Sequence, residues 1–471
     1  MNALPPPGRF HGHHAIVIGG SIAGLVAARV LAAHFDRVTV YDRDALPSDA
    51  AQRRGVPQGR HGHGLLASGL RGLKALFPDL ERELLAAGAV PGDVIGDMRW
   101  FQHGHFKAQF NGGFDGILLS RPLLERSVRR QVEKLPNVTI VDNARVMGVL
   151  SDRDRVQGVR IRRAGDEESS VTADLVLDAG GRGSHVPRWL GEMGYAKPST
   201  DEVWVGLGYT TRVFRRMPGE LDGDRGIIVA PTPPRETRVG FMLAMEGDRW
   251  IVTLGGWLGN HAPTELPSFI EFARSLPRPE IYDVIRHAEP LGEVATFGFP
   301  ASVRRRYEAL KQFPSGLLVL GDAMCSVNPI YGHGMSVAVL QVLALHDLLE
   351  SPVPLERAWQ PYFASAASVI DRAWTIAVGA DFAFKGVTGQ RPAGVDLINR
   401  YMSYVHRAAS IDRVVCRTFF DVANLLAPTT AMLRPSILAR VARACLLSPP
   451  APAERRPAGH DSQSRRAMKT A

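Results

Sequence analysis

Long hydrophobic runs and paired cysteines are missing from this 471-residue sequence. It contains no run of about eighteen apolar residues, so a membrane-spanning helix is not expected. The first residues, MNALPPPGRFHGHH, hold no apolar stretch of the kind found in signal peptides. The three cysteines, Cys325, Cys416 and Cys445, are scattered and odd in number. This argues against a disulfide framework and predicts a cytoplasmic protein.

A basic block interleaved with aromatic residues is also missing, although the formal net charge is +9. The positive charges are mostly dispersed arginines, so no nucleic-acid partner is expected. A hydrophobic content of 45% is ordinary for a globular protein, and the length predicts two or three domains. The ends, residues 1–12 and 449–471, are predicted to be disordered; the second is proline-rich and nearly free of large apolar residues.

The first folded unit expected is a strand, a turn, a helix and a second strand. His14–Ile18 is a short apolar run that ends at glycine, which indicates a buried strand. Apolar residues at helical spacing follow over Ser21–His34, and Arg37–Tyr41 is a second apolar run. The order matches a dinucleotide-binding unit, in which the helix start faces the phosphates.

The turn of this unit, GGSIAG, carries the expected phosphate contacts. Gly19 allows the tight turn, and Gly24 allows the helix to pack closely on the sheet. Ser21 replaces the middle glycine and could donate its hydroxyl to a phosphate oxygen. Asp42 ends the second strand, where a carboxylate would accept hydrogen bonds from ribose hydroxyls. The full set assigned to the cofactor from this unit is Gly19, Ser21, Ile22, Ala23, Gly24, Asp42 and Arg43.

Two further buried strands end in glycine-rich turns, DAGGRGSHVPR from Asp178 and GLLVLGDAMCSVNPIYGHG from Gly316. Between them lies a stretch of alternating strands, and from about residue 350 the pattern is helical. One α/β domain with an insertion explains this order best. We predict a discontinuous domain of residues 13–90, 115–198 and 299–350, an inserted mainly antiparallel β domain of 91–114 and 199–298, and a helical C-terminal region of 351–448.

The three glycine-rich stretches together resemble the motifs of class A FAD-dependent monooxygenases. The resemblance implies a Rossmann-like, p-hydroxybenzoate hydroxylase-like FAD-binding domain and covers nearly all of residues 13–350. The stretches RRGVPQGRHGHGLLASG and GDAMCSVNPIYGHGMSVAV are most similar to the flavin epoxidases of polyether pathways, of the lasalocid and monensin type. Ser21, and Asp178 followed by Ala-Gly-Gly, depart from the pattern of the class, and the second departure leaves a nicotinamide role open.

This resemblance gives roles to the residues that follow the third strand. Asp322 would hydrogen-bond a ribityl hydroxyl of FAD, and Gly332 and Gly334 would lie against the pyrimidine edge of the flavin. The helix that begins near Met335 would point its positive end at the same edge. Pro329 would stiffen the wall over the C4a edge.

The resemblance also places residues from other segments at the cofactor. Arg121 resembles the arginine that meets the FAD phosphates, with a solvated arginine at a helix start as the alternative. Val146 resembles the strand residue beside the adenine. The loop of residues 53–63 would contact FAD or gate access to it, through Arg54 and His61.

Histidines also occur in two glycine-rich stretches, and neither stretch is predicted to bind a metal. His61 and His63 form an H-x-H pair, but no further ligand stands at metal spacing, and no metal site is predicted. His333 stands between two glycines and is interpreted as a polar surface residue.

The implied reaction needs no catalytic acid or base, because the flavin C4a-hydroperoxide of this class is the oxidant. One oxygen atom of O2 would enter an apolar substrate, most simply as the epoxide of an alkene in a polyketide or terpenoid. NAD(P)H, or flavin reduced by a separate reductase, would supply the electrons. Four apolar side chains of the β domain are candidates for the substrate cavity, although core packing is the favoured interpretation of each one taken alone: Trp204, Phe241, Met242 and Trp257.

Three alternative functions remain. An aromatic hydroxylase of the same class fits the same motifs. A flavin-dependent halogenase is less favoured, because none of the seven tryptophans stands two residues from another and W-x-W-x-I-P is therefore missing. A non-enzymatic FAD-fold carrier would not need the flavin-ring contacts.

The stretch of residues 410–447 is apolar, with arginines at intervals. It is expected to pack as a lid over the domain interface, and contact with a membrane surface is the less favoured interpretation.

Overall fold

The structure is a computed structural model that describes residues 10–447. The structure does not describe residues 1–9 and 448–471, so most of the first end predicted to be disordered and all of the second, 449–471, lie outside the described range. The first strand already begins at Gly12, inside the predicted end of residues 1–12. The backbone N–H of His11, just before it, donates to the carbonyl of His34 at 2.9 Å, so these residues are tied to the fold.

A parallel five-stranded sheet organises the first part of the fold, and it confirms the predicted α/β class. Its strands follow the order β17-β11-β1-β2-β7, and neighbours pair in parallel throughout. Because all strands run the same way, their carboxyl ends meet at one edge of the sheet. The bounds are β17 (Leu317–Val319), β11 (Leu175–Asp178), β1 (Gly12–Ile18), β2 (Phe35–Tyr41) and β7 (Val138–Val141).

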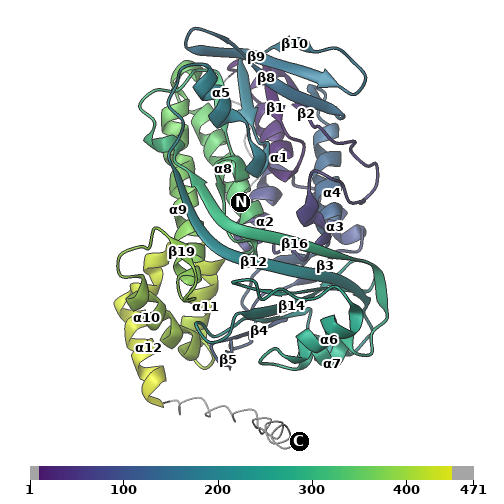
Figure 1. The fold of residues 1–471 in the computed structure, drawn as a ribbon, viewed down its shortest axis with the longest axis vertical. Coiled ribbons are helices and arrows are strands. Elements are labelled where there is room, and N and C mark those ends of the chain that lie inside the picture. Colours follow the sequence, from purple (N-terminus) through teal and green to yellow (C-terminus); the bar gives the residue numbers. More distant parts are fainter. Residues whose placement is uncertain (1–9, 448–471) are drawn as a thin grey trace, which may run out of the picture.

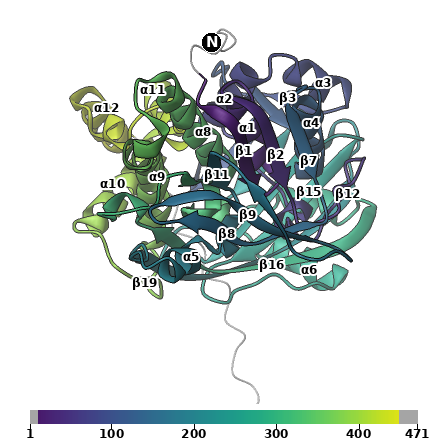
Figure 2. The ribbon, with the colours of Figure 1, turned by 90° about the horizontal axis from the view of Figure 1, so that it is seen from above.

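Helices cover one face of this sheet, and a small antiparallel sheet of order β10-β9-β8 covers the other (Figure 2). The helices on this part are α1 (Ile22–Leu31), α2 (Ala67–Leu76), α3 (Leu80–Ala86), α4 (Arg121–Glu133), α5 (Val186–Glu192) and α8 (Gly334–Glu350). The small sheet comprises β8 (Ala144–Asp152), β9 (Arg155–Arg163) and β10 (Ser169–Thr172), and β3 (Val90–Gly92) pairs with β6 (Gly116–Leu118).

A second, nine-stranded sheet confirms the inserted β domain, and its two 16-residue strands cross the middle of the molecule (Figure 1). The strands pair antiparallel, except β13 with β4. Helices α6 (Leu266–Arg274) and α7 (Glu280–Ile285) belong to the same domain. The strands are β18 (Cys325–Ser326), β16 (Pro290–Arg305), β12 (Thr200–Arg215), β15 (Arg249–Gly256), β14 (Arg238–Met245), β13 (Gly226–Val229), β4 (Met98–Gln102), β5 (His105–Phe106) and β19 (Thr388–Gly389).

Two predicted domain boundaries differ from the structure. Strand β16 runs unbroken through the expected boundary at residues 298 and 299, because its residues keep pairing with β12 as far as Arg305. The helix α9 (Trp359–Asp381) was placed in a separate helical region, yet Tyr362, Phe363 and Ile370 are buried in the same core as β1 and β11. The α/β domain therefore includes most of α9.

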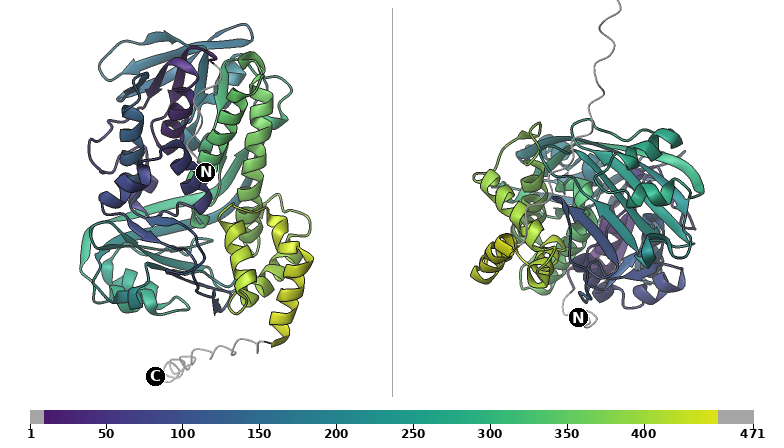
Figure 3. Two further views of the ribbon diagram at one scale, coloured as in Figure 1. Left: turned by 180° about the vertical axis from the view of Figure 1, so that it is seen from behind. Right: turned by 90° about the horizontal axis from the view of Figure 1, so that it is seen from below.

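Three helices form the rest of the C-terminal region, beside the large sheet (Figure 3). Phe419 and Phe420 meet the ring of Trp100 on β4 edge-on. No helix within residues 10–447 has the length and apolarity required to cross a membrane. The helices are α10 (Val395–Ala408), α11 (Arg413–Ala423) and α12 (Pro435–Leu447).

Candidate functional site

A cavity of about 560 Å³ lies where the carboxyl edge of the parallel sheet meets the large sheet. The turns that follow β1, β11 and β17 all contribute to its lining, as do residues after β2 and on β8. A crevice at the carboxyl ends of parallel strands is where open α/β folds bind ligands. The three glycine-rich stretches of the sequence are therefore brought together at one site.

The turn after β1 has the geometry that its glycines predict. Gly19 has a φ of +101°, a conformation that favours glycine. A Cβ atom on Gly24 would lie 1.8 Å from the carbonyl oxygen of Gly19, so a side chain there would force α1 away from the turn. Gly19, Ser21, Ile22 and Ala23 line the cavity, whereas Gly24 sits behind it.

Ser21 makes contacts that the sequence did not predict. Its hydroxyl donates to Glu125 on α4 at 2.7 Å and accepts from Nη2 of Arg121 at 2.9 Å. The proposed donation from Ser21 to a phosphate does not fit this arrangement, because Glu125 takes the hydroxyl proton. Arg121 lines the cavity, and its Nε is buried without a hydrogen-bond partner among the described residues, so it remains available to a ligand.

Asp42 lines the cavity, but much of its hydrogen-bonding capacity is used by the protein. Its carboxylate accepts from the backbone N–H of Gly20 at 2.7 Å and of Asp44 at 2.9 Å. The guanidinium of Arg53 lies 3.1 Å from it and also pairs with Asp44 and Glu125. These carboxylates raise the pKa of Arg53 against the opposing effect of its burial.

Arg53, not Arg54, is thus the arginine of this loop that faces the cavity. Arg54 is exposed and does not contribute to the lining. Sequence reasoning selected the wrong neighbour, because the two arginines are adjacent in an irregular loop without a periodic face. At the same end of the cavity, the lining includes Arg43, which the sequence assigns to the cofactor together with Asp42, and Val146, which it assigns to the adenine.

The opposite end of the cavity is formed by Asp322 and the start of α8. Burial raises the pKa of Asp322, and the positive charges of Arg121 and Arg182 oppose that rise. No described residue donates a hydrogen bond to its carboxylate, which leaves both oxygens for a ligand. Pro329, Gly332, Gly334 and Met335 line the same end, and α8 begins at Gly334 without a side-chain cap, so its free backbone N–H groups attract negative charge.

The interpretation of His333 as a surface residue is wrong, because the structure buries it. Only 1% of the residue is exposed. Burial lowers the pKa of its imidazole to about 4, so it is neutral at physiological pH. Its ring stacks on that of Tyr331, within the segment from Pro329 to Gly334.

Aromatic side chains of the large sheet form the cavity wall that faces this segment. Phe241, one of the four candidates from the sequence, is among them. Met242 is fully buried in the β-domain core, Trp257 is 3% exposed in another cluster, and Trp204 is 44% exposed. The aromatic wall, as we call it, comprises Tyr209, Phe241, Phe297 and Phe299.

His63 lines the cavity next to the aromatic wall, whereas the predicted His61 lies behind it. The ring of His61 packs edge-on against Tyr209, and its Nδ1 lies 2.8 Å from the hydroxyl of Thr211. Nδ1 of His63 lies 2.8 Å from the carbonyl oxygen of His61. Burial and the charge of Arg121 lower the pKa of His63 to about 3, and burial lowers that of His61 to about 4.

These residues fit an FAD molecule laid along the cavity. One end offers a glycine turn, a helix start and an arginine with a free Nε for the pyrophosphate. The other offers an unengaged carboxylate for hydroxyls and an uncapped helix start for the electron-rich flavin edge. Sequence reasoning missed Arg53, His63 and most of the aromatic wall, since only the tertiary structure brings them to the cavity.

Comparison with known proteins gives the same picture. A family profile described as "FAD binding domain" matches residues 13–353. Protein Rv3254 of Mycobacterium tuberculosis is 33% identical over 441 residues, which cover 88% of this chain and 90% of that protein. Squalene epoxidase 1 of Arabidopsis thaliana is 23% identical over 71% of this chain and 59% of its own length. Kynurenine 3-monooxygenase of Salinispora arenicola is 27% identical over 71% of this chain and 72% of its own length.

Two solved structures share the fold. The structure of PqsL from P. aeruginosa in complex with 2-aminobenzoylacetate has a TM-score of 0.62, with 19% identity over 80% of this chain and 97% of its own. A flavoprotein/dehydrogenase from Cytophaga hutchinsonii has a TM-score of 0.67, with 15% identity over 92% of this chain and 98% of its own.

Proposed function

The chain belongs to the FAD binding domain family of FAD-dependent monooxygenases, and from this premise we propose that it inserts one oxygen atom of O2 into an alkene of an apolar substrate, to give an epoxide. Polyketides and terpenoids are the substrate class that we favour. The sequence resemblance to polyether-pathway epoxidases supports this choice, as does a relative named as a squalene epoxidase.

One observation carries the proposal: the cavity wall that faces Pro329–Gly334 holds no general base at neutral pH, and the one charged group stacked on it is the guanidinium of Arg182, 4.8 Å from the ring centre of Phe299. This wall is built from Phe241, Phe297 and Phe299, with Tyr209 and His63. The pKa of His63 is lowered to about 3, so its imidazole is neutral and a weak base. Burial raises the pKa of Tyr209 well above its ordinary value, so its phenol keeps its proton. Transfer of an electrophilic oxygen to an alkene needs an apolar cavity and no general base.

The other residues of the cavity hold and orient the cofactor. When bound, FAD supplies the activation of O2 that no protein side chain provides. Arg121 and the turn at Gly19 would hold the pyrophosphate, and Asp322 would accept from a ribityl hydroxyl. The start of α8 would stabilise negative charge on the flavin ring through its backbone N–H groups. The aromatic wall would exclude water and place the alkene.

The electron source belongs to the proposal as well. We infer that NAD(P)H binds transiently or that a separate reductase supplies reduced flavin. The turn from Asp178 to Ser184 lines the cavity as a second glycine-rich segment, but its Asp178 carboxylate is bonded to Ser184 and to the N–H of Gly180. This carboxylate is therefore engaged with its own turn rather than directed to a nicotinamide.

Aromatic hydroxylation is the second candidate, and a relative named as a kynurenine 3-monooxygenase supports it. Hydroxylation of a phenol gains from a base that accepts its proton, and the low pKa of His63 makes it a poor one. Two weaker candidates remain. A halogenase would give a halogenated product, and a non-enzymatic FAD-fold carrier would give no product.

Anaerobic mixing of the FAD-loaded protein with NADH or NADPH, with and without candidate alkenes and phenols, tests both the electron source and the substrate class. Bleaching of the flavin absorbance reports reduction, and mass spectrometry after admission of 18O2 reports the product. An epoxide that carries one labelled oxygen supports the proposal. A labelled phenol without any epoxide supports the hydroxylase, and a protein that never binds flavin contradicts both.

A further inference from the structure

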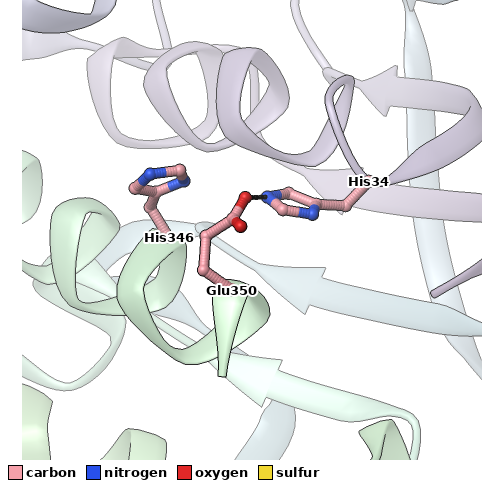
Figure 4. A group of neighbouring side chains, drawn as sticks. All are labelled: His34, His346 and Glu350. Atoms are coloured by element: carbon pink, nitrogen blue, oxygen red, sulfur yellow. Dashed lines mark ion pairs between the residues drawn. The ribbon is translucent and has the colours of Figure 1, made fainter. Parts of the chain in front are cut away.

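Two buried histidines and a glutamate gather near the ends of α1 and α8 (Figure 4), and none of the three lines the cavity. His34 follows α1, and His346 and Glu350 lie in the last turns of α8. Each residue offers one ligand atom, and these three atoms lie within 4.8 Å of one another. We call this group the histidine–glutamate cluster.

The local structure explains why the three side chains meet. His346 and Glu350 are four residues apart on α8 and therefore share one face of that helix. Helix α1 packs along α8, and His34 ends the turn that follows it. Both helices begin at the cavity, with Ile22 and Gly334, and both end at the cluster. At 1.5 Å per residue, α8 spans about 24 Å between the two places.

The electrostatics of this place favour a cation. The carboxyl ends of α1 and α8 converge here, and each carries a partial negative charge. Glu350 places its carboxylate at the negative end of α8. A carboxylate at that end of a helix is unfavourable unless a cation lies nearby. His34 is fully buried, and Nδ1 of His346 is buried without a hydrogen-bond partner among residues 10–447.

We propose that the histidine–glutamate cluster is a binding site for a divalent transition metal, with Zn²⁺ as the best match. Two imidazoles and one carboxylate form a ligand set that zinc takes in proteins. In a tetrahedral site with bonds of about 2.0–2.1 Å, ligand atoms lie about 3.3–3.4 Å apart. Nε2 of His34 and Oε1 of Glu350 are 3.4 Å apart, which is long for a charge-assisted hydrogen bond of about 2.7–2.9 Å.

The fourth position would be filled by water. The side chain of Glu350 is 30% exposed, so this side of the cluster is open to solvent and a metal can reach it. Bound metal would join the ends of the two helices that start at the cofactor cavity. Its role would be structural, because no part of the cavity lining reaches the cluster. The proposal concerns a different site from the proposed epoxidation and does not depend on it.

Zinc titration of the full-length, FAD-loaded chain after dialysis against a chelator tests the proposal. Isothermal titration calorimetry and elemental analysis give affinity and stoichiometry, and the melting temperature gives the coupling to folding. The variants are Glu350→Gln, which changes a partly exposed side chain, and His346→Gln. The matched control is Asp36→Asn, which breaks the exposed pair between Asp36 and His13, whose atoms are 2.6 Å apart. Retained flavin absorbance shows that each variant is folded.

We expect the wild-type chain to bind one Zn²⁺ and to melt at a higher temperature with it, and Mg²⁺ to have no such effect. Each cluster variant should lose at least about tenfold in Zn²⁺ affinity, whereas Asp36→Asn should not. Absence of stoichiometric Zn²⁺ binding would overturn the proposal and leave an ordinary histidine–glutamate ion pair. Equal Zn²⁺ affinity of the wild type and Glu350→Gln would overturn it too.

Discussion

The carboxylate of Asp381, the last residue of α9, accepts a hydrogen bond from the indole nitrogen of Trp257 at 2.8 Å. The same oxygen accepts from Nδ2 of Asn328 at 3.0 Å and from the hydroxyl of Tyr331 at 2.9 Å. Asn328 and Tyr331 flank Pro329, which lines the cavity. One buried carboxylate therefore joins α9, the large sheet and the segment expected to face the flavin.

The Asp381→Asn variant should change how stability depends on pH. Burial raises the pKa of Asp381 to about 7, although its three hydrogen bonds oppose the rise. Between about pH 4 and pH 7 the unfolded chain ionises this group and the folded chain does not, so this group's stabilising contribution falls as pH rises. The slope approaches about 1.4 kcal/mol per pH unit and is absent in the variant.

Urea unfolding of both FAD-loaded proteins at pH 5, 6, 7 and 8 measures this effect. The stability of the wild type relative to Asp381→Asn should decrease from pH 5 to pH 7 and then level off. A difference that stays constant over this range would contradict a raised pKa for Asp381.

The adjacent arginines Arg53 and Arg54 should differ sharply. Arg53→Gln removes the partner of three nearly buried carboxylates, so the free energy of unfolding should fall by about 3 kcal/mol or more. Arg54→Gln alters an exposed side chain and should stay within about 0.5 kcal/mol of the wild type. Denaturant unfolding of the two variants side by side decides the matter, and equal losses would show that the structure places the wrong arginine in the cavity.

Asp322→Ala should weaken FAD binding without unfolding the chain. Its carboxylate lines the cavity near the charges of Arg121 and Arg182 and accepts no hydrogen bond from a described residue. The loss should therefore equal one or two hydrogen bonds to a charged group, or about ten- to a hundredfold in the dissociation constant. Flavin fluorescence titration measures the affinity. Asp347→Ala, an exposed change on α8, is the control and should bind FAD as the wild type does. A fully loaded Asp322→Ala protein would remove this residue from the site.

Phe241→Ala removes a ring from the aromatic wall, which should enlarge the cavity and shift the substrate preference toward bulkier alkenes. Because alternate residues of a strand point to opposite faces, Phe241 lines the cavity while its neighbour Met242 is buried in the β-domain core. The ratio of kcat/KM for bulky over small alkenes should rise by about tenfold in Phe241→Ala. Met242→Leu should leave it unchanged, and FAD affinity should be the same in both variants. An unaltered ratio in Phe241→Ala would place the substrate elsewhere.

The sequence alone predicted the architecture and the ends of the cavity. Local periodicity and the placement of glycines predict three of its parts: the strand and turn at Gly19, the strand before Asp322, and the β stretch after residue 199. These signals depend only on residues that are close together in the sequence. Parallel strands then bring their carboxyl ends to one edge, so that Gly19 and Asp322 line the same cavity although about 300 residues separate them in the sequence.

The tertiary structure decided which side chains of the irregular segments reach the site. Nothing local distinguishes Arg53 from Arg54 or predicts that His333 is buried, because loop side chains follow their long-range partners rather than a period. The same holds for Asp381 and Trp257, and for His34 and His346, which have no shared pattern in the sequence. These residues interact only because packing buries them together, so that their polar atoms must pair with one another instead of with water.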